Sequence, residues 1–327
     1  MVMTTAISPT PLDRPIAAWL AHQRALGRRY DVEEWVLNSL RKFIGQSPGR
    51  DLGRASFDRW CATFPHLANN TLLCRQRIVR RFCLHRRRKE PDCFVPDPLY
   101  FTRPEPFRRP VIIEPEQIAR MLTAADDMPA TSGSPLRPAV YRMAVILLYT
   151  TGLRRGELLR LTLADCEPES GVLRIRESKF HKSRILPLSP DGHAELRDYL
   201  QQRLAPPFGK DPDTSLLINM EGGLRPYTGT GISNGIQTLF KAAGVEDSEG
   251  RRPRVHDMRH SFAVGALIRW YLEGADVQSN LPKLAMYMGH VSIVSTAYYL
   301  HFLPKLRAIA SDRFESVFGD LVSETTA

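Results

Sequence analysis

The chain has 327 residues, of which 43% are hydrophobic and 24% are charged, a composition typical of a folded globular protein. Its formal net charge is +10, and this excess lies entirely in residues 1–110, which carry 20 basic and 10 acidic side chains. Residues 111–327 carry 25 of each and are neutral overall. A basic N-terminal third on a neutral body predicts a polyanionic partner, with nucleic acid as the first candidate.

Membrane and secreted proteins are disfavoured by the sequence. The longest apolar run, residues 143–149, is far shorter than the ~20 residues of a membrane-spanning helix, and no signal peptide is visible. The cysteines are odd in number and form no close pair, which favours a reducing, cytoplasmic setting. Cys74, Cys83, His85 and Cys93 lie close together but lack C-x-x-C spacing, so we expect structural thiols rather than a zinc site.

The first part of the chain is predicted to form a small helical bundle. Apolar residues recur at helical spacing over 12–28 and 32–43, and further helices are expected near 57–64 and 71–88. The last helix and its end are strongly basic. We expect these cations to contact nucleic-acid phosphates rather than to form only a solvated surface: Arg75, Arg77, Arg80, Arg81, Arg86, Arg87, Arg88 and Lys89.

Five prolines in fifteen positions mark residues 96–110 as a linker. It would separate a helical domain over 1–95 from a second domain over 111–327. In the second domain, residues 171–188 predict a β-hairpin, because the strand-like segments VLRIRE and RILPL flank SKFHKS. Helices are expected around it, over 116–125, 138–149, 231–243, 256–270, 281–288, around residue 299 and over 304–321.

Three short stretches of the second domain concentrate reactive side chains: TGLRRGE at 151–157, HDMRH at 256–260, and GH at 289–290 followed by YY at 298–299. Taken singly, each has an ordinary structural explanation. An arginine and a glutamate three residues apart can form a surface ion pair on one helix, and a tyrosine can be a core aromatic. Only their joint order and spacing carry a functional prediction.

Together these stretches resemble the tyrosine recombinase, or phage integrase, family over most of residues 111–310. That family's signature is an Arg in L-R-x-x-E, a Lys on a β-hairpin, H-x-x-R, G-H, and a Tyr nine residues after that His. The sequence supplies the matching residues in the same order: Arg154 with Glu157, Lys179, His256, Arg259, His290 and Tyr299. The resemblance implies a mainly α fold with a small β-sheet, in which a helical, SAM-like core-binding domain precedes an α+β catalytic domain.

The resemblance also implies which residues bind the phosphate that is attacked. Arg154 and Arg259 would hold its non-bridging oxygens, since guanidinium groups bind oxyanions bidentately and stay protonated. His290 would add a hydrogen bond to the same phosphate, and Glu157 would orient Arg154 or His256. We expect His260, like Asp165, to support the fold instead.

The remaining roles concern proton transfer. A tyrosine hydroxyl has an ordinary pKa near ~10, so the nucleophile needs a base or a cationic environment, and His256 is the candidate base. The nine-residue spacing selects Tyr299 as the nucleophile, with its neighbour Tyr298 as the alternative. By resemblance Lys179 would protonate the leaving 5′ hydroxyl, and Lys182 is the alternative for that role.

The activity implied by the resemblance is the cutting and rejoining of DNA strands through a 3′-phosphotyrosine intermediate, with no metal and no cofactor. The partners would be double-stranded DNA and further copies of the chain, four protomers on two sites, in integration, excision or transposition of a prokaryotic mobile element. The helix over 304–321 would dock on its own domain or on a neighbouring protomer. Two alternatives stay open: a type IB topoisomerase acting as a monomer, and a DNA-binding regulator without catalysis.

Overall fold

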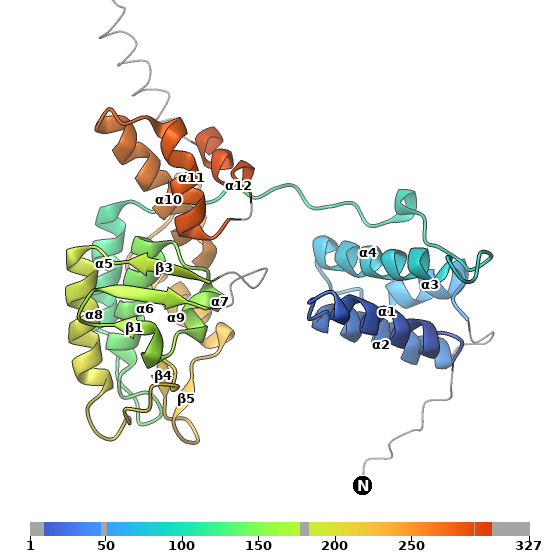
Figure 1. Ribbon diagram of the computed structural model, residues 1–327, viewed down its shortest axis with the longest axis horizontal. Helices are drawn as coiled ribbons and strands as arrows, with labels where there is room; N and C mark the ends of the chain where they lie inside the picture. Colours follow the sequence, from blue (N-terminus) through green and yellow to red (C-terminus); the bar gives the residue numbers. More distant parts are fainter. Residues whose placement is uncertain (1–9, 47–50, 177–182, 291, 303–327) are drawn as a thin grey trace, which may run out of the picture. The chain divides into compact units, whose positions relative to one another are not determined.

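The computed structural model describes residues 10–46, 51–176, 183–290 and 292–302. The chain divides into two compact units, Met1–Arg108 and Arg109–Ala327 (Figure 1). Both are built mainly of helices, and the second also contains two small antiparallel sheets. The mainly α fold with a small β-sheet that the sequence predicted is confirmed.

The first unit is a helical bundle around an aromatic core. Its described helices are α1 (Asp13–Ala25), α2 (Asp31–Gly45), α3 (Arg54–Ala62) and α4 (Asn69–Arg86). The apolar stripes of these helices meet inside, where the large side chains Trp19, Leu37, Leu40, Trp60 and Phe82 are buried. Most of the apolar positions of this region are therefore buried within the unit, whereas Leu26, Val32 and Trp35 are exposed.

Part of the segment predicted as a linker packs on the first unit. The backbone amide of Thr102 donates to the side-chain carbonyl of Gln76 at 3.0 Å, and that of Glu105 donates to Asn70 Oδ1 at 3.1 Å. In return, the amide of Asn69 donates to the carboxylate of Glu105 at 3.0 Å. This segment contains a single 3-10 turn at Pro98–Tyr100, and polar side chains of α4 bind the backbone that follows it.

The second unit carries the remaining helices and the sheets. Its described helices are α5 (Pro115–Asp126), α6 (Arg137–Thr151), α7 (Arg155–Arg160), α8 (Pro190–Arg203), α9 (Gly229–Ala242), α10 (Val255–Leu272), α11 (Val277–Met288) and α12 (Val294–Ala297), and a 3-10 helix follows at Tyr298–Phe302. None of the helices described in either unit has the length and apolarity to cross a membrane.

The larger sheet has the strand order β1 (Cys166–Glu167), β2 (Val172–Ile175) and β3 (Arg184–Pro187), all antiparallel. Strands β2 and β3 are the two arms of the predicted hairpin. Their register pairs Leu173 with Leu186 and Ile175 with Arg184. The turn of the hairpin, residues 177–182, lies outside the described residues, and so do Lys179 and Lys182.

Features of this unit that were not predicted from the sequence include strand β1, the short pair β4 (Ile218–Asn219) and β5 (Arg225–Pro226), and helix α8. The start of α8 does carry a sequence signal, because Ser189 caps it by accepting the amide of Gly192 at 3.2 Å and Pro190 occupies its first turn. Gly192 in that first turn weakens the helical propensity and hides the signal.

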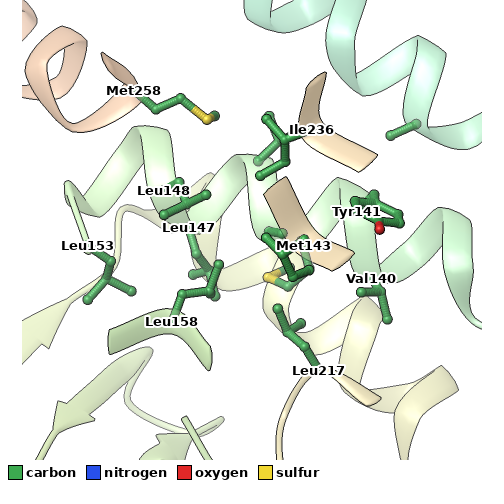
Figure 2. Close-up of a cluster of buried hydrophobic side chains, with 14 of the residues drawn as sticks. Val140, Tyr141, Met143, Leu147, Leu148, Leu153, Leu158, Leu217, Ile236 and Met258 are labelled. Atoms are coloured by element: carbon green, nitrogen blue, oxygen red, sulfur yellow. The ribbon is translucent and has the colours of Figure 1, made fainter. Parts of the chain in front are cut away.

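Helix α6 is the centre of the second unit. It is buried nearly all round, with Val140, Met143 and Leu147 fully or almost fully covered, as expected for a helix enclosed by others. Figure 2 shows these side chains in one cluster with Ile236 of α9 and Met258 of α10. Arg154, which follows α6 by three residues, is thus attached to a closely packed helix.

The chain that leads into the second unit is tied to helix α10. The amide of Ile113 donates to Ser261 Oγ at 2.8 Å, and the amide of Val111 donates to the buried carboxylate of Asp257 at 3.4 Å. Both acceptors lie on α10 beside the H-x-x-R residues. The first residues of the unit therefore belong to the packing of this helix.

Two helical glycines allow a test of the packing around α6. A Cβ built on Gly235 of α9 would lie 2.1 Å from the ring of Tyr141, whereas one built on Gly265 of α10 meets nothing within 4 Å. We expect Gly235→Ala to lower the free energy of unfolding by about 1–3 kcal/mol or more through overpacking. Gly265→Ala should raise it by up to about 1 kcal/mol through helix propensity. Urea unfolding of both variants measures the difference, and equal effects of the two would contradict this packing.

Candidate active site

Helices α6 and α11 each end at a glycine in the left-handed conformation. The carbonyl oxygens at these helix ends accept hydrogen bonds from arginine side chains. Gly152 ends α6 with φ +62°, and a Cβ on it would lie 2.5 Å from the ring of Phe262. Its carbonyl accepts a hydrogen bond from Arg259, which is 2% exposed. The last carbonyls of a helix have no partner within the helix and carry partial negative charge, so a guanidinium group binds well there.

The end of α11 repeats this arrangement. Gly289 ends the helix with φ +67°, and the last carbonyls accept from three arginines of distant segments. Arg184 of β3 donates to the carbonyl of Tyr287 at 2.8 Å, Arg259 of α10 to that of Met288 at 2.7 Å, and Arg154 to that of Gly289 at 3.0 Å. One helix end therefore brings together side chains from the hairpin, α10 and the start of α7.

A buried carboxylate fixes the same cluster from the other side. Glu157 in the first turn of α7 accepts the backbone amide of Arg154 at 3.0 Å and its guanidinium at 2.8 Å. It also accepts from Arg184 at 2.9 Å and 3.2 Å. Burial alone would raise the pKa of Glu157, but the hydrogen bonds from Arg184 and Arg154 outweigh it and lower the pKa to about 2.

Tyr299 lies against this cluster and is more deeply buried than its neighbour Tyr298. The side chain of Tyr299 is 3% exposed and close enough to Arg259 for its pKa to be affected by that charge, whereas Tyr298 is half-buried. Burial raises the pKa of Tyr299, and the charges of Arg259 and Arg154 oppose that rise. Burial, and then the charge of Arg154, lower the pKa of Arg259 to about 10, so this guanidinium stays positive at neutral pH.

Histidines surround the Tyr299 ring. His290 stacks on it at 6.2 Å between ring centroids, and its Nδ1 is 2.7 Å from the hydroxyl of the fully buried Thr296. Desolvation, and then the charge of Arg259, lower the pKa of His290 to about 4, which leaves the ring neutral at pH 7. His260 meets the edge of Tyr299 at 5.4 Å, although the sequence assigned His260 only to the fold.

His256 is exposed and lies on the other side of His260, with ring centroids 4.9 Å apart. Desolvation lowers its pKa, and the charges of Arg259 and Arg154 lower it further. The ring is therefore neutral at pH 7 and free to accept a proton. The structure thus gathers the predicted site residues that it describes in the second unit into one cluster: Arg154, Glu157, His256, Arg259, His290 and Tyr299.

Arg184 is the member of this cluster that the sequence reasoning missed. Its signal is the alternation of β3: side chains two apart on a strand share a face, and Leu186 is fully buried. Arg184 therefore faces the core, directly opposite the buried Ile175 of β2. A core-facing arginine needs a buried anion or carbonyls, which Glu157 and the end of α11 supply.

The predicted DNA-binding cations of the first unit have unequal surroundings. Arg86 is 6% exposed and is held by Asp51 at 2.8 and 3.1 Å and by Glu90 at 2.8 Å, so it acts as a structural ion-pair residue. This corrects its prediction as a phosphate contact, because its charge is already compensated and covered. Arg75 is packed between Trp35 and Phe64.

The other basic side chains of this set differ in their exposure to solvent. Arg80 donates to the carbonyl of Pro96, and Arg81 donates to Glu33 at 3.2 Å. The exposed members of the set are Arg77, Arg81, Arg87, Arg88 and Lys89. Their contact with phosphates stays a prediction, and two of them already have protein partners: Arg81 pairs with Glu33, and Arg87 donates to the carbonyl of Cys93 at 3.3 Å.

The sequence predicted structural thiols rather than a zinc site among Cys74, Cys83, His85 and Cys93. Cys83 is buried, which raises its pKa to about 12, and Cys93 is half-buried, whereas Cys74 is exposed. Within the described residues, no three His, Cys, Asp or Glu side chains are grouped as a metal site would need.

Comparison with known protein families and sequences gives consistent matches. Residues 112–305 match the family described as the phage integrase family. The putative integrase/recombinase y4rB of Sinorhizobium fredii is 36% identical over 250 residues, which span 74% of this chain and 77% of that protein. Tyrosine recombinase XerC of Lactobacillus delbrueckii subsp. bulgaricus is 32% identical over 161 residues, about half of each chain.

Solved structures of the same fold are also found. The Tn1549 transposon integrase in complex with transposon right end DNA superimposes with a TM-score of 0.59, covering 88% of this chain and 93% of that one at 18% identity. The XerH site-specific recombinase bound to a palindromic difH substrate has the same TM-score at 17% identity, covering 86% of this chain and 79% of that one. At these identities the likeness is one of fold.

The low pKa of Glu157 predicts how stability depends on pH. Because the folded-state pKa is depressed from 4.5 to about 2, the carboxylate contributes about 3 kcal/mol above pH 4.5 and loses this contribution as the pH falls toward 2. We expect the difference in unfolding free energy between the unchanged protein and Glu157→Gln to shrink over that range. Urea unfolding from pH 7 to pH 2 tests this, with Glu167→Gln in the exposed pair with Arg174 as control. A difference independent of pH would refute it.

Proposed function

The chain belongs to the phage integrase family of tyrosine recombinases, and on that premise we propose the following mechanism for it. It is a site-specific recombinase that cuts and rejoins DNA strands through a covalent bond between Tyr299 and a 3′ phosphate. The observation that carries this proposal is the convergence of Arg154, Arg259, His290 and Tyr299 on one cluster at the end of α11.

The two arginines are proposed to bind the scissile phosphate. Arg154 donates to Glu157 and Gly289, and Arg259 donates to Gly152 and Met288, so their planes are fixed before DNA arrives. Each guanidinium has five N–H donors, which leaves further donors for the non-bridging oxygens. Donors held in place in this way stabilise the charge that develops in the transition state without reorganising during the reaction.

Tyr299 is proposed as the nucleophile. Its phenolic oxygen forms a bond to phosphorus while the bond from phosphorus to the 5′ oxygen breaks. The phenolic proton passes to the neutral His256, directly or through water, and Arg259 stabilises the phenolate. If the Thr296 hydroxyl donates to Nδ1 of His290, Nε2 carries the proton and can donate to the phosphate.

The leaving 5′ oxygen requires a proton of its own. We assign this step to Lys179, which lies in sequence between β2 and β3, with Lys182 as the alternative, by resemblance to the family signature. Rejoining is the reverse reaction: a 5′ hydroxyl of another strand attacks the phosphotyrosine and releases Tyr299. The energy of the phosphodiester bond is kept in the covalent intermediate, so the proposed reaction uses no nucleotide cofactor.

The proposed substrate is double-stranded DNA. The Tn1549 integrase and XerH structures that share this fold contain DNA. In this chain the positive surface that backbone phosphates require would come from exposed cations on α4 and directly after it: Arg77, Arg81, Arg87, Arg88 and Lys89. These contacts would provide affinity, whereas the cluster around Tyr299 would provide chemistry.

The proposed assembly is four protomers on two DNA sites, because exchange between two duplexes requires four strand cuts with one nucleophile for each. The similarity to the putative integrase/recombinase y4rB and the shared fold with a transposon integrase support a role in the integration, excision or transposition of a mobile element. Proteins of this kind act on DNA, which gives the proposed cytoplasmic setting.

The adjacent tyrosines allow a sharp test of the nucleophile. On a nicked duplex carrying the cognate site, the unchanged protein should form a covalent adduct that persists in EDTA and survives denaturing electrophoresis. Tyr299→Phe should abolish the adduct, because no phenolic oxygen faces Arg259. Tyr298→Phe is the matched control and should retain it. Loss with Tyr298→Phe alone would show that the assignment is wrong.

The arginines are predicted to act in catalysis more than in binding. Arg154→Ala and Arg259→Ala should each slow strand cleavage by about 10²–10³-fold or more. Affinity for the site should change only a few-fold, since most phosphate contacts are elsewhere. Gel shift and single-turnover cleavage separate the two effects. Loss of binding in proportion to loss of cleavage would mean that these residues position the duplex rather than stabilise the transition state.

A further inference from the structure

Arg184 of β3 contacts both α7 and the end of α11, two of the segments that form the candidate site. It lies at the start of strand β3, and its side chain is 11% exposed. It donates to both oxygens of Glu157 and to the carbonyl of Tyr287, two residues before Gly289. A Cβ on Gly289 would lie only 2.7 Å from its Nη1, so the space beside the helix end is shaped around this guanidinium.

We propose that Arg184 is a positioning residue for strand cleavage: by binding Glu157 it keeps the positive charge of Arg154 available to the scissile phosphate. This inference rests on the proposed function and adds to it a residue outside the family signature described above. Arg184 acts through Glu157 and does not itself touch the phosphate in this proposal.

The charge balance of the cluster is the first argument. Glu157 is needed to orient Arg154. If Glu157 were paired with Arg154 alone, its negative charge would cancel the positive field of Arg154 at the phosphate. Arg184 binds the same carboxylate at 2.9 and 3.2 Å, so the negative charge is shared between two cations. Among Arg154, Arg184, Arg259 and Glu157, two positive charges remain uncompensated, and a phosphodiester approaching its transition state carries close to that much negative charge.

The geometry of the contacts is the second argument. Arg184 uses Nε toward the carbonyl of Tyr287 and both terminal nitrogens toward Glu157, which is a fork spanning two partners. A lysine has one nitrogen at the end of a flexible stem and cannot reproduce this fork, although it keeps the charge. Glu157 is in turn bound by the amide and the guanidinium of Arg154, so its position fixes theirs.

The test compares two substrates that differ in one charge. In a methylphosphonate at the scissile position, a methyl group replaces a non-bridging oxygen, and the group is neutral. If Arg184 keeps the positive charge of Arg154 available to the phosphate, Arg184→Gln should slow single-turnover cleavage of the normal phosphodiester. We expect a factor of about 10–100, which is typical for residues that hold a group in direct contact with the reacting centre. Its effect on the methylphosphonate should fall below about threefold. Arg184→Lys, which keeps the charge, should recover part of the loss on the phosphodiester.

Controls separate this role from a structural one. Arg174→Gln, on the neighbouring strand in an exposed pair with Glu167, should cleave both substrates at nearly the normal rate. Equal slowing of both substrates by Arg184→Gln, or no slowing of either, would overturn the inference. If thermal melting shows that Arg184→Gln is unfolded, the ratio of the two rates for Arg184→Lys decides in the same way.

The failure of this inference is distinguishable from that of the proposed function. If the unchanged protein forms no adduct through Tyr299 on its cognate site, the proposed function itself fails. If the adduct forms normally and Arg184→Gln shows no dependence on the charge of the scissile group, only the role of Arg184 is overturned.

Discussion

The carbonyl oxygens at the ends of α6 and α11 are the constraint on which the candidate site depends. A helix leaves its last carbonyls without internal partners, and both helices stop at a glycine in the left-handed conformation. Arginines from the hairpin, α7 and α10 satisfy these oxygens, and in doing so they are held in fixed planes. Backbone groups thus hold the arginines on one side, and the buried carboxylate of Glu157 binds Arg154 and Arg184 on the other and compensates part of their charge.

This arrangement also explains which parts of the site could be predicted from the sequence. Arg154 and Glu157 are three residues apart at a helix start, so their contact is local and their spacing reveals it. The hairpin strands β2 and β3 and the buried helix α6 follow from apolar patterns alone. The choice of Tyr299 over Tyr298 came from resemblance to a family signature, and the structure places the ring of Tyr299 beside Arg259.

Other features depend on contacts between distant segments and could not be predicted in the same way. Arg86 belongs to a run of similar cations, and only its burial beside Asp51 distinguishes it from its neighbours. Arg184 lies more than a hundred residues from Tyr287, whose carbonyl it binds. His260 was assigned to the fold, yet its ring meets that of Tyr299 because α10 and the 3-10 helix pack together. In each case one residue type has several possible environments, and tertiary packing selects among them.

The attachment of residues 111–113 to α10 has a mechanical consequence. The amides of Val111 and Ile113 are bonded to Asp257 and Ser261, which flank Arg259 on the same helix. Tension on the chain at residue 110 is therefore borne first by α10 and not by α5, the next helix in sequence. Asp257 also accepts hydrogen bonds from the amide and the guanidinium of Arg254 at the start of α10. Tension at residue 110 therefore acts on the first turn of α10, which contains His256.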